Sequence, residues 1–512
     1  MNPQKISVLQ VGVSDWSKKF SLPDQLKWDF ITVEKAQKKL LLKDGFKPRV
    51  LMLTDLEQLD DLNETIRKTA PVYAVLYPQE QKSISPKIVD FLKNKRAVAV
   101  SLKDPTKLLK KIALSFFDNQ SGIKLGVNNI EINPAFNGTQ TYHGNSSLEL
   151  DSNYGSEYRP LVYWRNSMYV DPGKRVEVWL EYLKEESVNL KLQFFETANG
   201  STENEQPTWT LSEQQLQQPE ILERTHNEKN GSYLNAVLWI KGQGKIEISS
   251  LHFRWSRYEF GNLIVGGQRM VDRFRQEFFY YFDPGDLKPP LNVYFAGYRS
   301  LEGFEGYGML KKLGAPFLLF TDPRLEGGNF YIGSQEYEQK LLGVIKKVVA
   351  ELGFTQQQII LSGISMGTFA ALYYGSFLKA HAIILGKPLI NLGLIAENNR
   401  LLRPQGFDTS LDILMSGKAK GSSSKDLNHY IWRKLLQGNF KETVIAAAYM
   451  KNDDYDGLAF KQLVHQLQPQ QVKILGKGWI GRHNDNTPAI ISWFLNQYNY
   501  FLRNDFERNN YE

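Results

Sequence analysis

The sequence predicts a multidomain α/β protein, and three observations support that prediction. The chain has 512 residues, more than one ordinary core accommodates, which corresponds to about three domains. Apolar runs alternate with amphipathic helical patterns towards both ends, whereas the middle of the chain shows the alternation of β-strands. The content of 42% hydrophobic and 12% aromatic residues is typical of chains that fold along their whole length.

Residues 1–118 are expected to form a Rossmann-like α/β domain. Short β-branched runs such as residues 6–13 and 50–54 alternate with helical patterns such as residues 33–42 and 56–68. This alternation is typical of a parallel sheet with crossover helices. The first strand leads into VSDW rather than into a G-x-G-x-x-G turn, so we expect no bound nucleotide cofactor here.

Residues 119–258 are expected to form a β-sandwich of the jelly-roll type, similar to carbohydrate-binding modules. Strand patterns recur there at regular spacing and are separated by polar turns. In RVEVWLEYL, Val176 and Val178 alternate with Glu177 and Glu181, which is the period of a half-buried antiparallel strand. We expect the two valines to face the core and the two glutamates to face outward.

The predicted sandwich is rich in aromatic side chains that could stack on sugar rings. They include Tyr163, Trp164, Trp179, Trp239 and Trp255. Trp179 and Trp239 lie within alternating strands, which favours a place in the core over a sugar platform. Sugar binding is therefore a hypothesis for the domain as a whole.

Residues 259–512 return to α/β alternation and are expected to form a catalytic domain. The predicted strands are LNVYFAG, PFLLFTD, QIILSGIS, HAIILGKP, ETVIAAAYMKND and QVKILGK. Gly363–Gly367 read GISMG between a buried strand and a buried helix, which is the setting of the nucleophile elbow of α/β-hydrolases. We therefore predict that Ser365 is a nucleophile, the alternative being a turn of purely structural value. Bulky residues at Gly363 or Gly367 would clash in such an elbow.

A serine hydroxyl needs a general base and an acid that orients this base. His483 follows the last predicted strand and precedes a helix opening at Thr487–Pro488, which is where this fold carries its base. The acid is expected in the loop KNDDYDG after TVIAAAYM. Asp453 is favoured as the first carboxylate beyond the strand, Asp454 is the alternative, and Asp456 is expected to cap the next helix.

The oxyanion of the reaction needs N–H donors fixed in advance. One is expected from Met366, directly after the nucleophile, and the other from Gly297 or Tyr298 in the loop after LNVYFAG. No H-x-x-x-H pair or cluster of histidine with carboxylates at ligand spacing indicates a metal. We expect no tightly bound cofactor. The acyl donor would be a co-substrate, whose identity the sequence does not give.

The formal net charge is +7 at pH 7, which permits attraction to anionic partners. The lysines of residues 34–47 and 107–111 alternate with leucines at helical spacing, which is typical of a solvated helix face, so we expect no nucleic-acid partner. The basic stretch Ser416–Lys425 is rich in Gly and Ser and is expected to be a loop, with contact to a membrane or a partner suggested by its composition alone.

The absence of cysteine excludes disulfides and thiolate metal sites. The sequence has no apolar run long enough for a membrane helix and no secretory signal at its start. We therefore expect a cytoplasmic protein, with at most peripheral association at the inner face of the cell membrane.

Several segments together resemble one known family: KISVLQVGVSDW, the aromatic sandwich, VYFAGYRSLEGFEGYGML and IILSGISMGTFAALYYG, followed by the aspartate and histidine loops. Over its whole length the chain resembles the second accessory secretory protein of the accessory Sec system of streptococci and staphylococci. By position, the family's catalytic serine falls on Ser365, its acid on the Asp453–Asp454 pair and its histidine on His483.

This resemblance implies two activities. The first is an acyltransferase that O-acetylates N-acetylglucosamine on serine-rich repeat adhesins. The second is assembly with the other accessory secretory proteins, which helps to deliver the glycosylated adhesin to the accessory SecA motor. A carbohydrate esterase and a non-catalytic assembly or targeting factor are the alternatives.

Overall fold

The computed structural model describes residues 5–38, 47–80, 84–201, 208–223, 231–402, 410–416 and 421–508. The chain divides into two compact units. The first comprises Met1–Gln120, Gly173–Arg175 and Trp255–Gln268, and the second comprises the remainder. The first unit contains a five-stranded sheet, and the second contains a ten-stranded and an eight-stranded sheet.

The sheet of the first unit is entirely parallel and has the order β2-β1-β3-β4-β5. Its elements are β1 (Ile6–Gly12), β2 (Leu26–Thr32), α1 (Val33–Gln37), β3 (Val50–Leu53), α2 (Glu64–Thr69), β4 (Val75–Pro78), α3 (Pro86–Asn94), β5 (Val98–Val100) and α4 (Pro105–Ser115). This is a doubly wound order, so the predicted Rossmann-like domain is confirmed.

Two details of the first unit differ from the prediction. The helix predicted over residues 56–68 begins only at Glu64. Asn63 caps it by accepting a hydrogen bond from the backbone N–H of Ile66 at 3.0 Å. The strand β2 had not been predicted. The pattern over residues 33–42 begins as α1, and its end lies outside the described residues.

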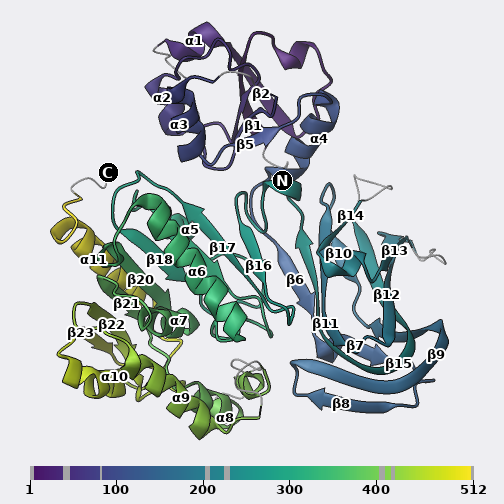
Figure 1. The fold of residues 1–512 in the computed structure, drawn as a ribbon, viewed down its shortest axis with the longest axis vertical. Coiled ribbons are helices and arrows are strands. Elements are labelled where there is room, and N and C mark those ends of the chain that lie inside the picture. Colours follow the sequence, from purple (N-terminus) through teal and green to yellow (C-terminus); the bar gives the residue numbers. More distant parts are fainter. Residues whose placement is uncertain are drawn as a thin grey trace. The chain divides into compact units, whose positions relative to one another are not determined.

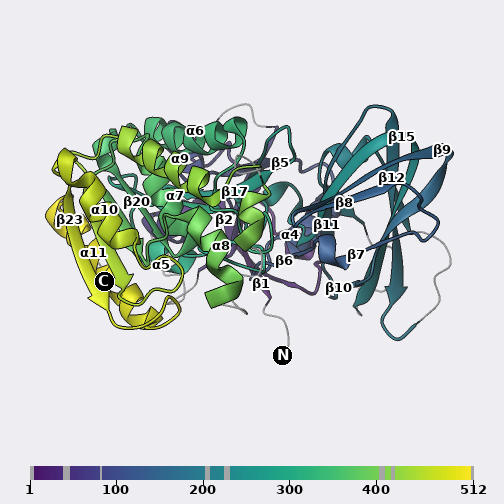
Figure 2. The ribbon, with the colours of Figure 1, turned by 90° about the horizontal axis from the view of Figure 1, so that it is seen from below.

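The middle of the chain forms the predicted sandwich from antiparallel strands. They are β6 (Gly122–Leu125), β7 (Ile130–Ile132), β8 (Thr139–His143), β9 (Ser147–Trp164), β10 (Met168–Val170), β11 (Val176–Lys184), β12 (Val188–Ala198), β13 (Trp209–Ser212), β14 (Glu220–Leu222) and β15 (Ser232–Trp255). Two pairs of predicted strands are in fact the single long strands β9 and β15. These two strands pair with register shifts near Trp239 and Gly242, where bulges bend them (Figure 2).

The strand β11 has the predicted alternation, because Val176 and Val178 lie in the sandwich core. The expected core position is wrong for Trp239, whereas Trp179 is buried as expected. Trp239 is half-buried on the face opposite Leu238 and Ile240, with Lys191 5.0 Å from its ring.

Trp179 is buried, but it is covered by charged side chains rather than by the sandwich core. The guanidinium carbons of Arg269 and Arg275 lie 4.1 and 3.9 Å from its ring centroid. Because Trp179 alternates with Val178 and Leu180, it lies on the face of β11 opposite the sandwich core, and a second layer of the protein covers that face.

The remaining sheet has the order β16-β17-β19-β18-β20-β21-β22-β23, which is the arrangement of an α/β-hydrolase (Figure 1). Its strands are β16 (Gln268–Val271), β17 (Glu277–Asp283), β18 (Leu291–Phe295), β19 (Phe317–Thr321), β20 (Ile359–Ile364), β21 (Ala382–Gly386), β22 (Val444–Met450) and β23 (Lys473–Trp479). Its helices are α5 (Tyr307–Lys311), α6 (Gln335–Leu352), α7 (Met366–Gly375), α8 (Leu392–Leu402), α9 (Ser424–Gln437), α10 (Ala459–Leu467) and α11 (Thr487–Asn504).

All the predicted strands of this sheet are present, and two further ones precede them. The strand β17 is buried along nearly its whole length and pairs antiparallel with β19. Neither alternation nor a following helix marked it in the sequence. Of the basic stretch Ser416–Lys425, residues 417–420 lie outside the described part, and Ser424 already begins α9.

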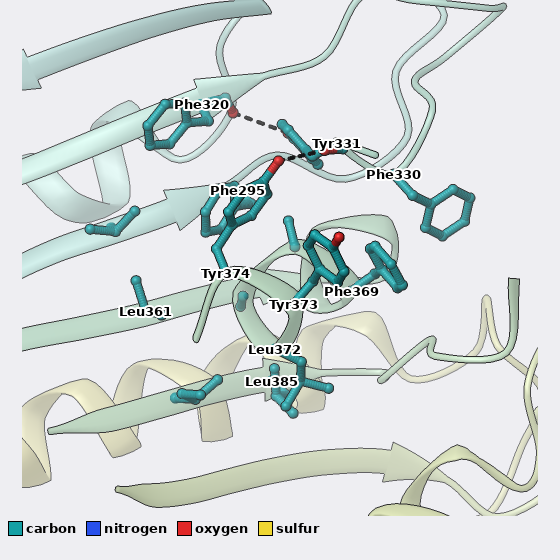
Figure 3. Close-up of a cluster of buried hydrophobic side chains, with 14 of the residues drawn as sticks. Phe295, Phe320, Phe330, Tyr331, Leu361, Phe369, Leu372, Tyr373, Tyr374 and Leu385 are labelled. Atoms are coloured by element: carbon teal, nitrogen blue, oxygen red, sulfur yellow. Dashed lines mark hydrogen bonds between the residues drawn. The ribbon is translucent and has the colours of Figure 1, made fainter. Parts of the chain in front are cut away.

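The helix α7, which follows the predicted nucleophile, is buried on all its faces. Phe295 of β18 stacks between Phe320 of β19 and Tyr374 of α7, with ring centroids 5.2 and 5.8 Å apart (Figure 3). Tyr331 donates its hydroxyl to the carbonyl oxygen of Phe320 at 3.2 Å, and Tyr374 donates its hydroxyl to the carbonyl oxygen of Tyr331 at 2.7 Å (Figure 3). This dense packing fixes α7 against β18 and β19.

None of the described helices combines the length and the apolarity that a membrane span requires.

Candidate active site

Ser365 occupies a sharp turn between β20 and α7. Its backbone has φ 55° and ψ −121°, the strained conformation typical of a nucleophile elbow. A Cβ atom at Gly363 would lie 2.2 Å from the carbonyl carbon of Gly367, and one at Gly367 would lie 2.0 Å from the carbonyl oxygen of Phe295. Both glycines are therefore required by the close approach of helix and strand, as the sequence predicted.

The structure brings His483 to Ser365. The Oγ atom of Ser365 lies 2.8 Å from Nε2 of His483, in the loop between β23 and α11. The other ring nitrogen, Nδ1, lies 2.8 Å from Oδ2 of Asp453. A neutral imidazole with its proton on Nδ1 fits both contacts, so Nε2 can accept the proton of the serine hydroxyl.

Asp453 and Asp454 have different contacts. Asp453 turns one oxygen to the histidine ring, and its other oxygen accepts the backbone N–H groups of Tyr455 at 2.8 Å and Asp456 at 3.1 Å. Asp454 instead accepts the backbone N–H of His483 at 2.9 Å. Asp453 is thus placed to orient the imidazole, while Asp454 holds the backbone that carries it.

Asp454 also pairs with Arg482, whose Nη2 lies 2.6 Å from Oδ2. Partial burial acts to raise the pKa of Asp454, but the hydrogen bonds from the His483 N–H and the Arg482 side chain outweigh it and hold this pKa below its usual value. The carboxylate is therefore ionised at neutral pH.

Asp456 does not cap α10 as predicted. Its buried carboxylate accepts the backbone N–H groups of Ile390 at 2.8 Å and Asn391 at 2.7 Å, in the segment after β21. Burial raises the pKa of this carboxyl group. The side chain ties two loops together, which spacing along the chain did not indicate.

One further cation lies close to these groups. Burial lowers the pKa of Lys387, while the carboxylates of Asp453 and Asp485 act in the opposite direction. Its Nζ donates to Oγ1 of Thr487 at 2.9 Å. The ring of Tyr455 lies over the imidazole of His483, with centroids 4.5 Å apart.

The candidate oxyanion donors lie beside the elbow, because β18 pairs with β20 and their following loops are neighbours. Met366 is the first residue of α7, where backbone N–H groups have no acceptor within the helix. The N–H of Gly297 donates to Oε2 of Glu305 at 2.8 Å, so this predicted donor already has an acceptor. Of the two predicted loop donors, Tyr298 is the one we retain.

The loop that carries Tyr298 is anchored by Glu302, a residue that sequence reasoning missed. The backbone N–H of Glu302 donates to the carbonyl of Gly122 at 2.7 Å. Its fully buried carboxylate lies 2.5 Å from Nδ1 of His252 and accepts from Nε of Arg254 at 2.5 Å. Both partners lie on β15, so the sandwich holds the loop of the α/β-hydrolase domain.

These contacts belong to a wider buried network of charges. Arg254 also pairs with Glu277, as does Arg269. Despite burial, these guanidinium groups lower the pKa of Glu277 to about 2. Glu181, His252 and Glu277 come within 4.8 Å of one another, a histidine–carboxylate cluster that spacing had not shown. Because the arginines pair with Glu277 and His252 pairs with Glu181, we interpret the cluster as an ionic network.

Replacing Glu302 with Gln is expected to lower the free energy of unfolding by about 3–5 kcal/mol, because Arg254 and His252 would lose a buried counter-charge. Thermal denaturation measures this loss. The matched control is Glu149→Gln on β9, whose partner Lys245 is half-exposed and whose loss costs at most about 1 kcal/mol. Equal effects of the two variants would contradict an anchoring role for Glu302.

Comparison with known proteins identifies the family to which this chain belongs. The model of the accessory Sec system GspB-transporter family matches residues 6–508. An accessory Sec system protein of Streptococcus gordonii is 38% identical over 98% of this chain and 99% of its own length. One of Staphylococcus aureus is 37% identical over 99% of this chain and 98% of its own length.

A solved structure supports the same relationship. A chain in the glycosylation-associated protein complex Gap123 of Streptococcus agalactiae is 38% identical, with a TM-score of 0.89 over 99% of this chain and 100% of that chain. Family and fold agree over the full length, so the chain belongs to the accessory Sec system GspB-transporter family.

Proposed function

We propose that this chain is a serine acyltransferase that transfers an acetyl group to N-acetylglucosamine on serine-rich repeat glycoproteins. The observation that carries the proposal is the hydrogen-bonded series Ser365–His483–Asp453 at a nucleophile elbow. A strained serine beside a buried base and acid is the arrangement of acyl-transfer enzymes. The sugar acceptor is supported by the family resemblance and by the link to glycosylation in the name of the Streptococcus agalactiae complex.

In the first half-reaction, Oγ of Ser365 attacks the carbonyl carbon of the acyl donor while Nε2 of His483 takes the hydroxyl proton. The backbone N–H groups of Met366 and Tyr298 would stabilise the oxyanion. The histidine then gives its proton to the leaving group, and the acyl group stays on the serine. Asp453 stabilises the imidazolium that forms.

In the second half-reaction, a sugar hydroxyl attacks the acyl-serine and gives its proton to His483. The ester forms on the sugar, and the proton returns to Ser365. Transfer must compete with hydrolysis, which uses the same residues. The acceptor hydroxyl therefore has to be bound and oriented in the site.

Acceptor dependence tests the proposal. We expect the purified chain, supplied with an acetyl donor, to add acetyl groups to the glycosylated adhesin, as intact mass measures. We expect slow consumption of the donor in the absence of acceptor. Donor hydrolysis at the same rate with and without the glycoprotein, and no mass gain, would instead indicate an esterase.

We also propose a role in export. The family is described as a transporter of GspB, and the Streptococcus agalactiae relative was solved in a complex. Assembly with the other accessory secretory proteins would bring the modified adhesin to the accessory SecA motor. Modification before export would place the reaction on the cytoplasmic side of the membrane.

A further inference from the structure

A cavity of about 500 Å³ lies within the second unit, between the sandwich and loops of the catalytic domain. Its walls include Glu181 and Tyr182 of β11 on one side and Phe274, Arg324 and Asn329 on the other. Ser365, Asp453 and His483 do not line it. The volume falls in the range of about 300–1,000 Å³ that is typical of small-molecule sites, enough for a mono- or disaccharide.

The charges around the cavity balance. Three glutamates and three arginines line it: Glu181, Glu247, Glu336, Arg273, Arg275 and Arg324. The most deeply buried arginine is already paired, because Arg324 donates to both oxygens of Asp322 at 2.8 and 2.7 Å. A site for an anion would present unpaired positive charge, so this lining favours an uncharged ligand.

Arg275 is likewise engaged in contacts with β11, which forms one wall of the cavity. Its Nε donates to the carbonyl of Leu180 at 3.1 Å, and its guanidinium carbon lies 4.2 Å from the ring centroid of Tyr182. These contacts hold the two walls of the cavity together. The site is therefore largely formed before any ligand binds, which lowers the entropic cost of binding.

The remaining lining suits a ligand with many hydroxyl groups. Hydroxyl side chains gather there, namely Ser146, Ser147, Ser249, Ser250, Ser334 and Ser416. Among them Phe274 is 44% exposed, with the guanidinium carbon of Arg273 4.9 Å from its ring centroid. An aromatic surface beside polar donors and acceptors can bind both the C–H face and the hydroxyl groups of a sugar ring.

A single loop connects the cavity to the candidate active site. The segment between β19 and α6 contributes Arg324, Leu325 and Asn329 to the cavity wall. In the same segment, a Cβ atom at Gly327 would lie 2.1 Å from the Tyr298 ring, and one at Gly328 would lie 2.4 Å from Cε of Met366. One side of the loop thus borders the cavity, while glycines of the same loop contact both candidate oxyanion residues.

From this arrangement we infer that the cavity is a subsite for an uncharged sugar of the acceptor glycan, distinct from the position of the reacting hydroxyl. The inference deepens the proposed function and rests on it for the identity of the acceptor. A sugar bound here would hold the glycan next to the elbow. It would raise the effective concentration of the reacting hydroxyl relative to water.

Binding without turnover tests the subsite. The full chain is titrated with the β-1,4-linked dimer of N-acetylglucosamine, in the absence of acyl donor, by calorimetry. Phe274→Ala is expected to raise the dissociation constant about tenfold, which is the effect expected when an aromatic contact is lost. The matched control is Phe377→Ala, because Phe377 is 42% exposed and lines a different cavity. Phe377→Ala is expected to bind the dimer as the wild type does.

Two results would overturn the inference: equal affinity of the wild type and Phe274→Ala, or loss of binding in Phe377→Ala instead. Competition by coenzyme A for the same cavity would overturn it as well, because it would assign the cavity to the donor. Labelling of Ser365 by a fluorophosphonate in Phe274→Ala verifies that the variant is folded. Binding without acetyl transfer would refute the proposed function and leave the subsite standing.

Discussion

Replacing Ser365 with Ala is expected to lower acetyl transfer by about 10⁶-fold, because the covalent route is lost when its nucleophile is removed. The same change should abolish labelling by a fluorophosphonate, which reacts only with an activated serine. Intact mass measures both effects. A single adduct on the wild type, absent from Ser365→Ala and from His483→Ala, is the expected result.

The matched control is Ser362→Ala, three residues earlier on β20. The Ser362 hydroxyl donates to the carbonyl of Val293 at 3.1 Å and lies in the core, away from the base. This variant should keep its adduct. An adduct that persists in Ser365→Ala would contradict the assignment of the nucleophile. No adduct on the folded wild type would favour a chain that acts in export by binding alone.

The fold was predictable where each element has its own local pattern. Alternating strands and helices indicated the Rossmann-like and hydrolase domains, and period-two alternation indicated the sandwich. Prediction failed where polar residues interrupt the pattern of a strand, or where the feature depends on tertiary contacts. The polar, glycine-containing segments inside β9 and β15 resembled turns, although bulges carry each strand through them.

The residues of the candidate site could be predicted where a sequence motif or their order along the chain identifies them. The elbow motif predicted Ser365 as the nucleophile, and the position after the last strand predicted His483 as the base. Asp453 was favoured over Asp454 only by its distance from the strand, and the structure places Asp453 against the ring of the base. The role of Asp456 was misassigned because its partners after β21 are 65 and 66 residues away in sequence.

The support of the site could not be predicted at all. Glu302 meets His252 and Arg254 across 50 and 48 residues, from a different domain of the chain, and no spacing rule connects them. The cavity likewise forms only when sandwich strands meet loops of the α/β-hydrolase domain. Such features depend on how domains pack against each other, and local sequence patterns carry no information about that packing.

Replacing Asp453 with Asn is expected to lower the rate of acetyl transfer by about 10⁴-fold. The amide nitrogen can donate where the carboxylate accepts, so the imidazole would be stabilised with its proton on Nε2 and could not accept the serine proton. The imidazolium would also lose its counter-charge. Because the two backbone contacts of Asp453 can be kept by the amide oxygen, the fold should survive. Single-turnover acylation measures the loss directly.

The neighbouring Asp454→Asn is the matched control and should lower the rate far less. Its amide oxygen can still accept the backbone N–H of His483, and the pair that it loses involves Arg482, whose side chain is 63% exposed. Such pairs contribute at most about 1 kcal/mol. If Asp454→Asn were the more damaging variant, the acid would belong to Asp454, and the imidazole would have to turn from its present contact during the reaction. Equal and small losses would mean that the base needs no acid, contrary to the geometry of the Nδ1 contact.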